Sequence, residues 1–202
     1  MAMSATESMP GQGSACAGGR GDRFPPASKK HLSSEQRSVY ERIEASRGSL
    51  PAPYYVLLDT PQVADLFEGL SAQVRDGVLP KHILEAIFLA TARRHKCAYQ
   101  WVAHINVAER VGLSSGVIKS IGRGDIPEDS EDVALVLRFM AALDRHHGVS
   151  DEVYDALLSM FGAQGIGELI VFCGLATTDL ALIPRTPPYA ALRPDSAAAG
   201  ER

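Results

Sequence analysis

Cysteine is scarce in this sequence, and the few cysteines present form no pair motif. Cys16, Cys97 and Cys173 make no CxxC motif and show no spacing typical of metal ligands. This pattern argues against a disulfide framework and against a structural zinc site. We expect any cysteine function here to depend on a single thiol.

Long apolar runs and an excess of positive charge are also missing. No run reaches the roughly 18–20 apolar residues of a membrane-spanning helix, and residues 1–30 contain no apolar segment typical of a signal peptide. The net charge is -4 and the pI about 5.9, which disfavours binding to polyanions. We therefore predict a soluble cytoplasmic protein with no membrane and no nucleic-acid partner.

Strand patterns are absent as well, and helical patterns fill the middle of the chain. Residues 1–30 are rich in Gly, Ser, Ala and Pro, which predicts a flexible tail, and a second tail is expected at 193–202. The remainder, 31–192, has enough hydrophobic residues for one core. Start and stop signals predict seven or eight helices, so the fold class is all-α: a compact multi-helix subunit. The predicted helices occupy about 33–48, 60–77, 83–90, 101–112, 114–122, 129–148, 150–162 and 167–183.

Chemically useful side chains gather around one predicted helix. Glu85 is the acid within an otherwise apolar segment, and the run Cys97-Ala-Tyr-Gln-Trp-Val-Ala-His104 follows it. Cys97 and His104 are seven residues apart, so on one helix they share a face. A helix starting near Lys96 would place the thiol at its N-terminus, where the thiolate is favoured. We predict that thiol, imidazole and carboxylate converge as catalytic groups.

Each of these residues also has a purely structural interpretation. Glu85 could lie on a narrow exposed stripe, Cys97 could be a small core residue, and His104 could be a satisfied structural histidine. Tyr99 and Trp101 are candidate walls of a substrate pocket as well as packing residues. The histidines lack ligand spacing, so no metal site is expected.

The spacing of Glu85, Cys97 and His104, with Tyr-Gln-Trp between the last two, resembles the carboxymuconolactone decarboxylase-like superfamily, which includes the alkylhydroperoxidases. The resemblance extends over about 33–192. It implies an all-helical subunit, a homotrimer or homohexamer, and pockets near subunit interfaces. In the peroxidase branch a glutamate, a CxxC pair and a histidine work together, and Gln100 stands where the second cysteine would be. In the decarboxylase branch the matching residue is His104, and no cysteine is required.

The decarboxylase-like chemistry suits these residues. Loss of carbon dioxide from an unsaturated acid or lactone needs a proton donor and stabilisation of a developing oxyanion. His104 would donate the proton, Glu85 would orient it, and Gln100 or Tyr99 would bind the substrate. This acid/base reaction on a small molecule needs no cofactor.

Three alternatives stay open. Cys97 could act as a single-cysteine thiol peroxidase recycled by an external thiol. Residues 108–122 resemble a helix-turn-helix, although Lys119 and Arg123 are the only cations of its second helix and the whole chain is acidic. Finally, the protein could bind a phenolic or lactone acid without converting it.

Overall fold

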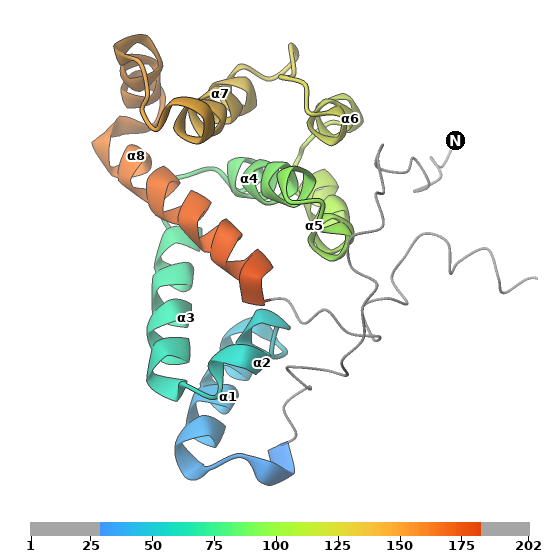
Figure 1. Cartoon of the computed structure of the whole chain (residues 1–202), viewed down its shortest axis with the longest axis vertical. Coiled ribbons are helices and arrows are strands. Elements are labelled where there is room, and N and C mark those ends of the chain that lie inside the picture. The colour runs from blue at the N-terminus through green and yellow to red at the C-terminus, as the bar shows by residue number, and fades with distance from the viewer. Residues whose placement is uncertain (1–28, 183–202) are drawn as a thin grey trace, which may run out of the picture.

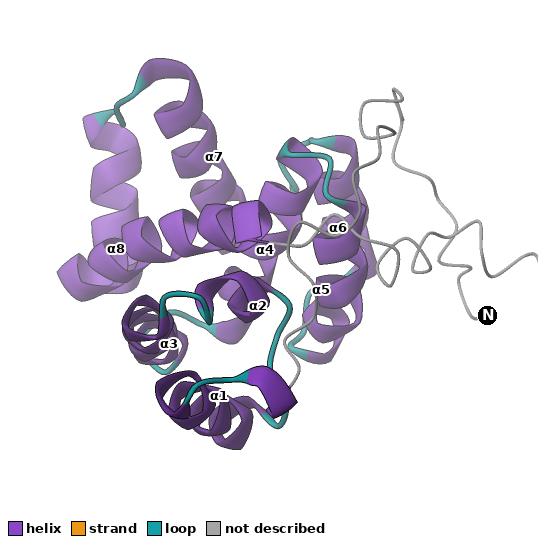
Figure 2. Cartoon of the chain, turned by 60° about the horizontal axis from the view of Figure 1, so that its bottom comes forward, coloured by secondary structure: helices purple, strands orange, loops and turns teal. Residues whose placement is uncertain are grey.

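The computed structural model describes residues 29–182, and this part of the chain contains helices and no strand (Figure 2). The predicted all-α class is confirmed. In chain order, after a short 3-10 helix, η1 (Lys29–His31), the helices are α1 (Ser34–Arg47), α2 (Pro53–Leu57), α3 (Pro61–Arg75), α4 (Lys81–Arg94), α5 (Ala98–Arg110), α6 (Ser115–Arg123), α7 (Glu131–His146) and α8 (Asp151–Leu182). Most of both predicted tails lies outside the described residues, but residues 29 and 30 belong to η1 and not to a tail.

The first three helices form a small layer with its own core. Ser33 begins α1 with a capping box: its hydroxyl accepts from the Gln36 backbone, and the Gln36 side chain accepts from the Ser33 backbone. Pro61 stands at the first position of α3, but the Thr60 side chain does not cap that helix and instead donates to the Leu57 carbonyl. The buried residues that join these helices are Val39, Ile43, Leu50, Tyr54, Leu57, Leu58 and Ala64.

The larger core is built around α4, which packs against α5, α6, α7 and α8 (Figure 1). Because α4 has neighbours on several sides, apolar residues occur nearly all round it, and Ile83, Ile87 and Leu89 are fully buried. The α6 residues Val117 and Ile118 are buried in the same core. In the segment that resembles a helix-turn-helix, α6 therefore uses its apolar side chains for packing.

The last helix, α8, crosses both layers and contacts α2, α3, α4 and α7 (Figure 1). It is continuous in outline, but Gly162 has φ 68° and ψ 175°, so the helix is kinked at the predicted stop. Residues 151–179 are long and apolar enough to span a membrane by length and composition alone. This corrects the expectation that no apolar run reaches that length. Leu169, Phe172 and Ala176 are fully or almost fully buried on the face that packs on the core, whereas Ile170 and Val171 on other faces are exposed.

Candidate active site

The predicted catalytic residues lie on the hairpin formed by α4 and α5. The turn between these helices is tight: Lys96 has a left-handed backbone, with φ 54°, and the Cys97 amide donates to the Ala92 carbonyl at 2.8 Å. The two helices therefore run in opposite directions side by side. As a result Glu85, early in α4, lies opposite His104 in the middle of α5.

Glu85 and His104 form a hydrogen-bonded pair, with 2.8 Å between the carboxylate Oε2 and the ring Nδ1. The side chains are 13% and 24% exposed, so the pair is largely shielded but still accessible. Phe88 stacks on the imidazole, with ring centroids 4.0 Å apart, and itself contacts Phe172 of α8 edge-on. With Glu85 as a carboxylate, which only accepts hydrogen bonds, Nδ1 would be the donor of this bond and Nε2 would be left for proton exchange.

Gln100 lies one helical turn before His104, on the same face of α5. Its side chain is buried, with the residue 2% exposed, yet neither Nε2 nor Oε1 has a hydrogen-bond partner in the described part of the chain. A buried amide without partners loses on the order of 1–3 kcal/mol per polar group. The amide is therefore suited to bind a polar group of a ligand beside the imidazole.

Cys97 is the N-cap residue of α5, so the predicted position of the thiol at a helix N-terminus is confirmed. The positive end of the helix dipole favours a thiolate there. The α-helical rise places its Cα about 10 Å from that of His104, with Gln100 between them. Of the three groups expected to converge, the structure thus joins Glu85 and His104 directly and places Cys97 one turn beyond Gln100.

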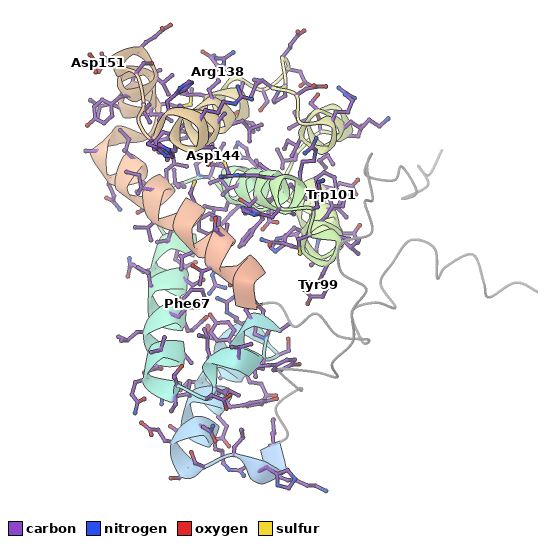
Figure 3. All side chains as sticks on the ribbon, viewed as in Figure 1. Phe67, Tyr99, Trp101, Arg138, Asp144 and Asp151 are labelled. Atoms are coloured by element: carbon purple, nitrogen blue, oxygen red, sulfur yellow. The ribbon has the colours of Figure 1, made fainter. Side chains whose placement is uncertain are left out.

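Tyr99 and Trp101 lie on opposite sides of α5 (Figure 3). The Trp101 ring packs on α6, because a Cβ added at Gly122 would lie 3.3 Å from ring atom Cη2. Tyr99 is on the side of α2, where burial raises the pKa of its phenol and Tyr55 adds to that effect. The two predicted substrate-binding aromatics therefore do not line one surface with each other.

A second polar cluster, which the sequence analysis missed, lies where α1, α2 and α3 meet. Glu68 is its centre: Arg47 Nη2 is 2.6 Å from Oε2, Arg75 Nη2 is 3.3 Å from Oε1, and the Tyr54 hydroxyl donates to Oε2. Burial opposes the charge of Glu68, but the bonds from Arg47 and Tyr54 outweigh burial and hold its pKa below the usual value. An acid on the apolar stripe of a helix was the signal that could have revealed this cluster.

Asp179 of α8 is the other residue that was missed. It is half-buried on the apolar face of that helix, and burial raises its pKa to about 6. Positive charge on Arg47, His104 and Arg75 acts in the opposite direction. Asp179 therefore lies within electrostatic reach of both the Glu68 cluster and the Glu85–His104 pair.

Within residues 29–182, no group of three metal-binding side chains gathers at one place. Two open clefts contain none of the residues of the Glu85–His104 pair. One lies along α7 and the loop before it, the other lies between α7 and the first half of α8, and both are lined by Glu131 and Arg138. These clefts contain none of the predicted site residues.

Two solved structures are similar to this chain over most of its length. One is described as alkylhydroperoxidase AhpD core, an uncharacterized peroxidase-related protein from Ralstonia eutropha JMP134; it has a TM-score of 0.61 and 19% identity, covering 86% of this chain and 97% of that chain. The chain has the alkylhydroperoxidase-like fold. An uncharacterized peroxidase-related protein from Silicibacter sp. TM1040 shares this fold with a TM-score of 0.63 and 17% identity, covering 85% of this chain and 94% of that chain.

No protein-family model matches the sequence, and no curated protein is similar to it. The resemblance noted from Glu85, Cys97 and His104 is thus confirmed for the fold. Because fold does not determine activity, the reaction must be argued from the side chains of the site.

Proposed function

We propose that this protein is an enzyme that uses acid/base chemistry, without a cofactor, to decarboxylate or otherwise rearrange a small unsaturated acid or lactone. The hydrogen bond between Glu85 and His104 is the observation that carries the proposal. It fixes the imidazole in one orientation with Nε2 available, which is the arrangement of a general acid or base. Gln100, the side chain one turn away, is an amide and not a second thiol.

In the proposed reaction, the bond between the substrate carbon and its carboxylate breaks and carbon dioxide leaves. The electron pair moves toward a conjugated carbonyl, whose oxygen accepts a hydrogen bond from Gln100 Nε2. Protonated His104 then donates its Nε2 proton to the carbon, and Glu85 stabilises the imidazolium until that transfer. No electron acceptor or metal enters this sequence of steps.

The test is release of carbon dioxide from a panel of unsaturated lactone acids, measured with the wild type, His104→Gln and the matched control His146→Gln. His146 is exposed near the end of α7, away from α5. We expect at least about a hundredfold loss of turnover in His104→Gln, as for a removed general acid, and none in the control. Equal turnover by His104→Gln and the wild type would exclude the proposed role of the imidazole.

A single-cysteine thiol peroxidase is the second candidate, supported by the position of Cys97 at the N-terminus of α5. The Cys97 thiolate would attack the peroxide O–O bond, giving a sulfenic acid and an alcohol or water. Two equivalents of an external thiol would then restore the thiol, releasing water and a disulfide.

Peroxide consumption under excess dithiothreitol decides between the two candidates. Cys97→Ser should abolish it if Cys97 is the peroxidatic thiol, whereas the control Cys173→Ser should not. Cys173 is a suitable control because burial raises the pKa of its thiol to about 12, which suppresses the reactive thiolate. Consumption that is equal in wild type and Cys97→Ser would exclude the peroxidase candidate.

We further propose that the enzyme is a soluble, cytoplasmic homotrimer or homohexamer that acts on a small molecule and binds neither nucleic acid nor membrane. Large apolar side chains exposed on α3 and α8 support self-association: Val63 is 51% exposed, Leu66 75% and Ile170 53%. Light scattering of the full chain tests this, and a monomer at micromolar concentration would contradict it.

A further inference from the structure

Two buried polar side chains of the α4–α5 hairpin lack hydrogen-bond partners within residues 29–182. They are Thr91, through Oγ1, and Gln100, through both Nε2 and Oε1. Each residue is 2% exposed. An unpaired buried polar group costs free energy, so its presence in a native fold calls for a specific explanation. Three such atoms in one hairpin indicate a place where another molecule completes the hydrogen bonds.

The hairpin brings Thr91 and Gln100 to the same level. Phe88 of α4 stacks on the His104 ring of α5, with ring centroids 4.0 Å apart. Thr91 comes three residues after Phe88, and Gln100 comes four residues before His104, so each is the next neighbour on its own helix face. Because α4 and α5 lie side by side and antiparallel, both steps lead toward the turn of the hairpin (Figure 1). Thr91 and Gln100 therefore lie one helical turn beyond the stacked rings, on two packed helices.

The two side chains do not satisfy each other. A hydrogen bond between the Thr91 hydroxyl and the Gln100 amide would give both of them a partner, and neither has one. The hydroxyl offers one donor, whereas the amide offers two N–H donors at Nε2 and an acceptor at Oε1. A guest that only accepts hydrogen bonds would leave Oε1 without a donor. The guest that satisfies all three atoms must both accept and donate.

The surroundings favour an uncharged guest. The two arginines that follow Thr91 on α4 are engaged elsewhere: Arg93 donates to backbone carbonyls at the end of α6, and Arg94 pairs with Asp144. A carboxylate buried between Thr91 and Gln100 would have no cation bonded to it, at a high cost in free energy. The carboxylate of the proposed substrate is therefore not the group that binds at this level.

We propose that Thr91 and Gln100 form a subsite for a hydroxyl group that stands next to the conjugated carbonyl of the substrate. This inference rests on the proposed acid/base function and narrows its substrate class to hydroxylated unsaturated acids or lactones. Gln100 Nε2 donates to the carbonyl oxygen, and the hydroxyl donates to Gln100 Oε1. The Thr91 hydroxyl donates to the oxygen of the same hydroxyl group. All three unpaired atoms are satisfied in this arrangement, and Gln100 reads an adjacent acceptor and donor.

The experiment compares three uncharged probes by calorimetric titration of the full chain: maltol, its methyl ether and the parent pyrone without the hydroxyl. Maltol has a hydroxyl next to a conjugated carbonyl, and its ether can only accept there. We expect maltol to bind on the order of tenfold more tightly than either analogue, because each analogue leaves buried polar groups unpaired. Equal binding of the three probes, or no binding of any, would overturn the proposal.

Variants assign the preference to the two side chains. Thr91→Val and Gln100→Leu should each reduce the preference for maltol to about one half or less, and Thr91→Ser should keep it because the hydroxyl is retained. The matched control is Thr177→Val, since the exposed Thr177 hydroxyl already donates to the Cys173 carbonyl of its own helix. A preference that survives in both Thr91→Val and Gln100→Leu would overturn the proposal.

Thermal unfolding without any probe tests the same point independently of binding. Thr91→Val removes a buried hydroxyl that has no partner, so the Tm should stay the same or rise. A clear fall in Tm would show that the hydroxyl is already satisfied, which would overturn the proposal, and this measurement decides if Gln100→Leu does not fold. None of these measurements requires turnover. A maltol preference that depends on Thr91, in a protein that releases no carbon dioxide from lactone acids, would refute the proposed reaction and leave the subsite standing.

Discussion

Replacing Gly77 with alanine should destabilise the fold through one side chain on a distant helix. Glu168 of α8 accepts hydrogen bonds from the backbone amides of Val78 and Leu79, at 2.8 and 3.3 Å, in the loop between α3 and α4. A Cβ on residue 77 would lie 2.3 Å from Glu168 Oε2, so the carboxylate would have to leave. The glycine is thus required by a close approach of another side chain.

The magnitude follows from the bonds that would be lost. A hydrogen bond to a charged group contributes about 1.5–3 kcal/mol, and the partial exposure of this loop lowers that value, so Gly77→Ala should cost about 1–2 kcal/mol. In a chain of this size that corresponds to a Tm lower by roughly 2–8 °C. The matched control is Gly69→Ala in α3, where nothing lies within 4 Å of the added Cβ. The control should be neutral or slightly stabilising, because alanine favours helix.

Thermal unfolding of a double-mutant cycle tests the cause. Once Glu168→Ala has removed the carboxylate, adding Gly77→Ala should have little further effect on Tm. An equal loss of stability from Gly77→Ala in the wild type and in Glu168→Ala would refute the reasoning, since it would mean that the glycine matters for its own backbone and not for Glu168.

Two other substitutions have defined outcomes. Glu68→Gln should lower the free energy of unfolding by about 2–3 kcal/mol at neutral pH, because it breaks a largely buried ion pair with Arg47. The pKa of Glu68 in the folded protein is below its ordinary value of 4.5, so the stability difference between the wild type and Glu68→Gln should be complete above about pH 4.5. The difference should shrink as the pH falls through the pKa of Glu68 in the folded protein. Denaturation midpoints that differ as much at about pH 3 as at neutral pH would contradict this. Gly122→Ala should shift the fluorescence of Trp101, the one tryptophan of the chain, because the new methyl group presses on its ring. Its effect on stability should stay within about 1 kcal/mol because alanine also favours the helix, and an unchanged emission spectrum would show that the ring is not in contact with α6.

Local sequence patterns were sufficient to predict the all-α class and several of the positions at which helices begin and end. The capping box at Ser33 and the kink at Gly162 depend on neighbours in sequence, so they could be recognised without a structure. The sequence analysis predicted that Glu85 orients His104 as an acid or base, and the two side chains are hydrogen-bonded in the α4–α5 hairpin.

Features that depend on packing between distant helices could not be predicted in this way. The position of Glu68 on the apolar stripe of its helix is a signal in the sequence, but only the meeting of α1, α3 and α8 brings Glu68 and Asp179 near Arg47. The helical spacing of Cys97 and His104 predicted a shared face, which stays a prediction because Cys97 is the N-cap residue of α5 and its backbone is not helical. The spacing did not show that Gln100, which is buried between Cys97 and His104, is closer to the imidazole along α5 than Cys97 is.

Chemical rescue by imidazole is the most direct test that the His104 ring transfers the proton. His104→Ala removes the ring and leaves space beside Phe88 and Glu85, into which free imidazole can diffuse. We predict that added imidazole restores turnover of the lactone acid in His104→Ala, in a saturable manner, and gives no comparable gain in the wild type. Turnover that persists in His104→Ala without imidazole would contradict a catalytic role for this histidine.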